Sequence, residues 1–105
     1  RNSSAASDVY KRQEQQLVRN LAVEWGPHNI RVNAIAPGLI KTDFARELWE
    51  DPKKTEAVER ITPLGRLGDP DDIGLLTASL ATRAGNYLTG QTITIDGGRM
   101  ITDPS

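Results

Sequence analysis

The chain has 105 residues, of which 37% are hydrophobic and 26% are charged, and its formal net charge is −1. This length suits one domain, and the balanced charge excludes a basic nucleic-acid-binding stripe and a disordered acidic tail. The absence of cysteine excludes disulfides and thiolate metal sites and suits a reducing compartment, for which we expect the cytoplasm. No apolar run approaches the roughly 20 residues that span a bilayer, so neither a membrane segment nor secretion is predicted.

The first thirteen residues, RNSSAASDVYKRQ, differ in character from the rest. They are mostly small and polar, and they lack helical or strand periodicity. The segment also resembles a translated adaptor sequence. We therefore expect residues 1–13 to be a non-native or disordered leader, and residues 14–105 to hold the folded part.

A helix and a strand are predicted next. From Glu14 to Trp25, apolar side chains recur on one helical face. Gly26 followed by Pro27 is expected to end this helix, with the glycine in the left-handed conformation. The alternation from 30 to 35 then predicts a strand with both faces partly buried. His28 lies in the connection, where we expect it to be a solvated loop residue. The apolar helical positions are Leu17, Val18, Leu21, Ala22 and Trp25.

Helices follow this strand. The stretch VNAIAPGLIKTDF breaks off at a Pro-Gly pair, after which Thr42 or Asp43 can cap a short helix. Asp51, with proline after it, begins a second short helix. Asp69 precedes Pro-Asp-Asp and begins a third, longer helix. The expected apolar side of the first short helix is Phe44, Ala45, Leu48 and Trp49.

The fold class follows from the order of these elements. TGQTITIDGG predicts a final strand centred on Ile93 and Ile95. Strands joined through helices indicate parallel pairing in an α/β layer fold. Two strands leave most edge groups unpaired, so we expect the C-terminal part of a doubly wound, Rossmann-like fold. The glycine-rich phosphate-binding turn of such folds does not occur in the sequence.

Three separate blocks carry a resemblance to a family. LAVEWGPHNIRVNAIAPGLIKTDF, PLGRLGDPDDIG and YLTGQTITIDGG together resemble the C-terminal half of a short-chain dehydrogenase/reductase. The resemblance covers residues 14–98 almost continuously, with the blocks in the family's order. It implies that the intact parent is an NAD(P)-dependent oxidoreductase, which transfers hydride between the nicotinamide of NAD or NADP and an alcohol or ketone.

The resemblance also implies a cofactor site at the Pro-Gly pair and the residues that follow it. Pro37 and Gly38 would form the wall beside the nicotinamide ring. The backbone of Ile40 would bind the carboxamide, and the Thr42 hydroxyl would bind the carboxamide or a phosphate. Ligands of open α/β sheets do lie beyond the carboxyl ends of the strands. The alternative is that the Pro-Gly pair only turns the chain and Thr42 only caps a helix.

The two short helices would correspond to the family's substrate lid. Phe44, Leu48 and Trp49 would then face a pocket for a small alcohol or carbonyl compound. The alternative is that these side chains pack on the body of the protein, as aromatic residues at helical spacing often do. The resemblance further implies a homo-oligomer for the intact parent.

No catalytic residue and no metal ligand is assigned. In the family, a serine and a Tyr-x-x-x-Lys motif act on the substrate, and the motif's register puts its lysine at Lys11 and its tyrosine at Ser7. Serine cannot replace a phenol, and Tyr10 is in the wrong register because adjacent helix residues point in different directions. We therefore expect the chain alone to be inactive. The alternative function is a truncated, non-catalytic interaction module that pairs with a full-length partner.

Overall fold

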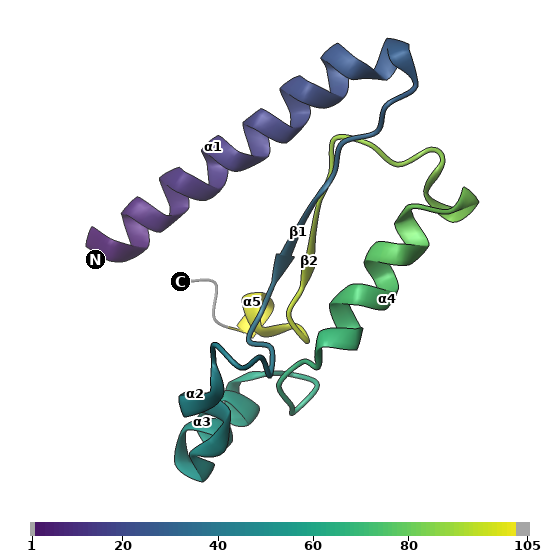
Figure 1. Cartoon of the computed structure of the whole chain (residues 1–105). Coiled ribbons are helices and arrows are strands. Elements are labelled where there is room, and N and C mark those ends of the chain that lie inside the picture. The colour runs from purple at the N-terminus through teal and green to yellow at the C-terminus, as the bar shows by residue number, and fades with distance from the viewer. Residues whose placement is uncertain (1, 103–105) are drawn as a thin grey trace. The chain divides into compact units, whose positions relative to one another are not determined.

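The computed structural model describes residues 2–102, with side chains from 9 to 101. The elements follow the predicted order of helix, strand, two short helices, helix and strand, and a further short helix ends the described chain (Figure 1). They are α1 (Asn2–Trp25), β1 (Ala34–Pro37), α2 (Arg46–Glu50), α3 (Pro52–Ile61), α4 (Pro70–Leu80), β2 (Thr92–Ile95) and α5 (Arg99–Thr102), with 3-10 turns at Gly26–His28 and Arg83–Gly85.

The chain divides into two compact units. Unit 1 comprises the residues up to Ile35 together with Ser79–Ile93. Unit 2 comprises Ala36–Ala78 together with the residues from Thr94 onward. The predicted cofactor and lid residues all belong to unit 2, so this unit alone can position the candidate site.

Helix α1 differs from the prediction at its start, and the turn that follows it differs in its left-handed residue. It begins at Asn2 rather than at residue 14, so it runs through the segment for which no helix was expected. It does end at Trp25, but the expected left-handed glycine was wrong, because Gly26 begins a 3-10 turn. The left-handed residue is Asn29, with φ 60°, and its amide donates to the Gly26 carbonyl at 2.9 Å. Asparagine tolerates this conformation because its short polar side chain can bond locally.

The two strands are parallel neighbours in one sheet (Figure 1). The final strand lies where it was predicted, whereas β1 starts four residues later than the predicted strand and includes Pro37. The reason is a pair of bonds to residues far along the chain: Asn33 Nδ2 donates to the Leu88 carbonyl at 2.9 Å, and Asn33 Oδ1 accepts from the Gln91 amide at 3.1 Å. These side-chain bonds interrupt the regular ladder at Asn33, although the Gly90 amide still donates to the Val32 carbonyl at 2.7 Å.

Arg31 ties the two segments of unit 1 together. Its Nη2 donates to the Leu80 carbonyl at 2.7 Å, at the end of α4, and its Nη1 donates to the Leu88 carbonyl at 3.4 Å. A guanidinium at a helix C-terminus satisfies a carbonyl that has no partner in the helix. Buried Gly85 leaves room for this contact, since a Cβ there would overlap the Leu80 carbonyl oxygen. Sequence patterns alone did not predict this arrangement.

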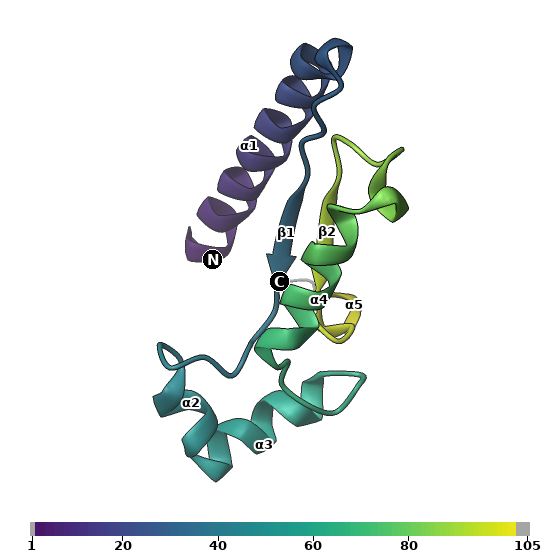
Figure 2. The ribbon, with the colours of Figure 1, turned by 45° about the vertical axis from the view of Figure 1, so that its right-hand side comes forward.

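Unit 2 contains the two short helices α2 and α3 (Figure 2). These helices follow the predicted caps only in part. Asp51 caps α3 as expected, with its carboxylate accepting from the Lys53 amide at 2.9 Å. Helix α2, however, begins only at Arg46, and neither Thr42 nor Asp43 is its N-cap residue. Phe44 therefore lies in the turn before the helix and is fully exposed, which corrects the prediction that it belongs to the helix's apolar side.

Few apolar side chains are buried in the described part of the chain. The buried ones are Ala22, Val58 and Leu67, whereas Leu17 and Val23 on α1 and Leu75 on α4 are largely exposed. The hypothesis of an interaction module depends on such exposed apolar surface. Among the described residues, no helix is both long and apolar enough to cross a membrane.

Candidate functional site

The candidate site begins where β1 ends. The Gly38 amide donates to the Ile95 carbonyl at 2.8 Å, which continues the strand pairing one residue beyond Pro37. A Cβ at Gly38 would lie 2.8 Å from both Cα and Cβ of Asp96, closer than real contacts allow. Glycine is therefore required here by the main chain that follows β2, a reason that the sequence did not reveal.

Ile40 has an unused backbone donor beyond the strand. It forms an isolated parallel bridge with Gly68. In this bridge Gly68 bonds to the two neighbours of Ile40: the Lys41 amide donates to the Gly68 carbonyl at 2.8 Å, and the Gly68 amide donates to the Leu39 carbonyl at 2.9 Å. The peptide groups of Ile40 itself therefore face the opposite edge. No described residue accepts a bond from its amide. An amide in this position can donate to a ligand's carbonyl oxygen.

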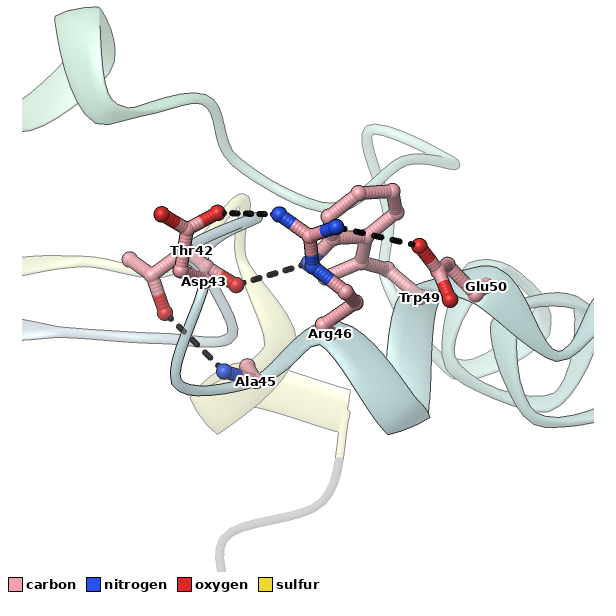
Figure 3. A network of polar contacts seen from close by, with 6 residues as sticks. All are labelled: Thr42, Asp43, Ala45, Arg46, Trp49 and Glu50. Atoms are coloured by element: carbon pink, nitrogen blue, oxygen red, sulfur yellow. Dashed lines mark hydrogen bonds and ion pairs between the residues drawn. The ribbon is translucent and has the colours of Figure 1, made fainter.

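Thr42 follows directly and offers a second donor. Its amide donates to the Ile40 carbonyl at 2.8 Å, and its Oγ1 accepts from the Ala45 amide at 3.3 Å (Figure 3). The hydroxyl hydrogen has no acceptor within residues 2–102, and the side chain is exposed. A hydroxyl is both donor and acceptor, so the turn contact and a bond to a ligand are compatible.

The chain after β2 forms a tight turn at the same strand ends. Gly97 and Gly98 have φ angles of 67° and 91°, and Cβ atoms there would meet Thr62 and Pro63 at 2.9 Å. Asp96 holds this turn by accepting from the Gly98 and Met100 amides, each at 2.9 Å. Both glycines are thus turn residues that also allow close approach of the chain.

A pocket of about 160 Å³ lies against these segments. Leu39 and Ile40 line it from the β1 side, Ile95 and Asp96 line it from the β2 side, and Arg66 is also part of its wall. Of the four predicted cofactor residues, only Ile40 is in this lining. The structure thus brings Ile40 together with the strand ends, while Pro37 and Thr42 lie exposed along the chain on either side of it.

An ion pair fixes the loop that carries Gly68. Arg66 Nη1 donates to Asp72 Oδ2 at 2.8 Å, and the same carboxylate accepts from the Asp69 amide at 2.8 Å. These two bonds to the charged form lower the pKa of Asp72 to about 2 from its ordinary value of 3.8. The Arg66 side chain is about half exposed, so solvent and salt screen the pair.

The pH dependence of stability should reveal this pair. Because the pKa of Asp72 is lower in the folded chain, its contribution is present above about pH 4 and is lost as the pH falls toward about 2. We expect Asp72→Asn to reduce the loss of stability over that range, as measured by urea midpoints at several pH values. Asp71→Asn is the matched control in the same helical turn. Equal acid sensitivity of Asp72→Asn and the wild type would contradict the assignment.

The predicted lid residues do not share one environment. Phe44 is fully exposed, whereas Leu48 and Trp49 are half-buried. Trp49 Nε1 donates to the Thr42 carbonyl at 2.8 Å. The sequence left two alternatives for Trp49, facing the substrate or packing on the body of the protein, and neither included this bond. No pattern in the sequence encodes a contact with a carbonyl seven residues earlier.

The residues compared with the catalytic motif, Ser7, Tyr10 and Lys11, belong to unit 1. Tyr10 and Lys11 are adjacent on α1, and both side chains are exposed. Ser7 falls within the same helix, and its side chain lies outside the described ones.

The two parallel strands, with helices joined to them in the chain, define an α/β protein of the Rossmann-like class. The family model described as enoyl-(acyl carrier protein) reductase matches residues 2–100. A tropinone reductase homolog of Arabidopsis thaliana is 49% identical over 83 residues, which is 79% of this chain and 31% of that protein. Dehydrogenase/reductase SDR family member 4 of Homo sapiens is 44% identical over 82 residues, covering 78% of this chain and 30% of that protein.

Solved structures agree with these relatives. A 4-hydroxyisoleucine dehydrogenase complexed with NADH superposes with a TM-score of 0.83 at 31% identity, covering 92% of this chain and 40% of that one. The Pseudomonas aeruginosa RhlG/NADP active-site complex gives a TM-score of 0.75 at 44% identity, covering 81% and 34%. The chain belongs to the short-chain dehydrogenase/reductase family. It spans about a third of the length of the curated relatives it matches.

Proposed function

We propose that this chain forms the carboxamide-binding side of the nicotinamide site in an NAD(P)-dependent oxidoreductase. In this proposal Ile40 and Thr42 hold the carboxamide, and Pro37 and Gly38 form the wall beside the ring. The bound cofactor would exchange hydride with a small alcohol or carbonyl compound. The catalytic serine, tyrosine and lysine would have to come from outside unit 2, and the 105-residue chain would bind without turning over substrate.

The observation that carries the proposal is the pair of unused donors beyond β1. The Ile40 amide and the Thr42 hydroxyl hydrogen both lack acceptors in the part of the chain that the structure describes. A carboxamide oxygen accepts two hydrogen bonds, so donors separated by one residue suit it. The relatives support the chemistry, since structures of family members were solved as complexes with NADH and with NADP.

Nicotinamide mononucleotide is the probe that tests this proposal, because it contains the carboxamide but no adenine half. We expect its titration into the ¹⁵N-labelled chain to shift the amide resonances of Gly38, Ile40 and Thr42. Ribose 5-phosphate is the matched control, since it has the sugar and phosphate without the ring. Absence of these shifts, or identical shifts with the control compound, would overturn the proposal.

A further inference from the structure

The Thr42 main chain makes two hydrogen bonds, one to a residue before it in the chain and one to a residue of α2. On the upstream side its amide donates to the Ile40 carbonyl at 2.8 Å. On the downstream side Trp49 Nε1 donates to the Thr42 carbonyl at 2.8 Å. The two bonds fix the peptide groups on either side of the Thr42 Cα, and therefore the direction in which its side chain leaves the backbone.

The indole that makes this bond is itself held in place (Figure 3). The Arg46 guanidinium carbon lies 5.7 Å from the centroid of the Trp49 ring, within cation–π distance. Arg46 also pairs with Asp43 at 2.6 Å and with Glu50 at 3.7 Å, so two carboxylates on opposite sides orient the guanidinium. Each pair is exposed and individually weak, but together they restrict Arg46 to a position over the ring.

The same cluster continues into α3. Thr55 Oγ1 donates to the Trp49 carbonyl at 3.0 Å and lies 3.4 Å from the Leu48 carbonyl. Asp51, which lies between the two helices in the chain, caps α3. Both helices are therefore bonded, through Trp49, to the residue that offers the hydroxyl. A movement of α2 and α3 would therefore also move the Thr42 main chain, through the bond from Trp49.

We propose that Trp49 is a positioning residue for Thr42: its indole, beneath the Arg46 guanidinium, bonds to the Thr42 carbonyl and fixes the main chain of the turn in which the Ala45 amide holds the Thr42 hydroxyl. In this way it couples the position of α2 and α3 to nicotinamide binding. The coupling to nicotinamide binding rests on the proposed function. We call the Trp49 indole bond to the Thr42 carbonyl, with Arg46 over the ring, the clamp. The clamp is a property of this chain and can be measured without any ligand. The prediction that Trp49 also faces the substrate stays a prediction.

The variant Trp49→Phe removes the N–H donor and keeps an aromatic ring for Arg46. We expect NMR coupling constants to show the Thr42 χ1 angle changing from one rotamer to an average of several. We also expect the affinity for nicotinamide mononucleotide to fall by about threefold or more, the value of one ordinary hydrogen bond. Trp25→Phe is the matched control, because it removes the only other indole and should change neither quantity.

Hydrogen exchange of the two indole groups in the wild type tests the same bond without a variant, in case Trp49→Phe does not fold. The Trp49 indole hydrogen should exchange with solvent more slowly than that of Trp25, which makes no side-chain hydrogen bond among the described residues. Equal exchange rates, or an unchanged Thr42 rotamer in Trp49→Phe, would overturn the clamp. An averaged rotamer with unchanged affinity would overturn its coupling to the cofactor. If the wild type does not bind the mononucleotide, the proposed function fails, while an averaged rotamer still supports the clamp.

Discussion

Replacing Thr42 by valine should weaken the binding of nicotinamide mononucleotide by about three- to tenfold, because it removes a donor worth roughly 0.5–1.5 kcal/mol. Valine has nearly the shape of threonine, so the backbone around position 42 can stay in place. Thr42→Ser is the matched control, since it keeps the hydroxyl and should retain most of the affinity. The measurement is the titration of the Ile40 amide shift.

The same variant separates the two roles that remain open for Thr42. Its Oγ1 accepts from the Ala45 amide at 3.3 Å, so loss of the hydroxyl also removes a turn contact worth about 1 kcal/mol of stability. If Thr42→Val lowers the urea midpoint but binds the mononucleotide like the wild type, Thr42 serves the turn alone. A loss in both quantities supports the hydroxyl as a ligand-binding group that also stabilises the turn.

The fold was predictable where the signal is local. The cap of α3 at Asp51, the start of α4 at Pro70 and the strand around Ile93 depend on residues within one turn or one strand, and the structure confirms all three. The beginning of β1 was not predictable in this way. Asn33 bonds to residues more than fifty positions away, and periodicity contains no information about such partners.

The candidate site shows the same division. The resemblance located the strand end, and Ile40 and Thr42 do present donors there, although their contact with a cofactor stays a prediction. The contacts that shape the site were not predictable. The Gly68 bridge to Ile40 and the Trp49 bond to Thr42 both join segments whose meeting is decided by tertiary packing. A helical pattern that included Phe44 was wrong for a related reason, since the turn at Thr42 delays α2 until Arg46.

Gly38→Ala should lower the free energy of unfolding by about 2 kcal/mol, as overpacking against an unyielding neighbour does. The added Cβ would lie 2.8 Å from Cα of Asp96, and that main chain is fixed by the bonds of Asp96 to Gly98 and Met100. The strand end must therefore move. Because Ile40 follows two residues later, we expect the mononucleotide affinity to fall as well. Urea unfolding and the amide titration measure the two effects.

Gly74→Ala is the matched control in the same unit. Position 74 lies in α4, and a Cβ there meets no described atom within 4 Å. Alanine in an open helical position stabilises by roughly 0.5–1 kcal/mol, so this variant should shift the urea midpoint in the opposite direction. A Gly38→Ala chain as stable as the wild type would show that the segment after β2 can yield, and that glycine is not required at this strand end by packing. If stability falls while the affinity for the mononucleotide is unchanged, the position of Ile40 does not depend on the contact between Gly38 and Asp96.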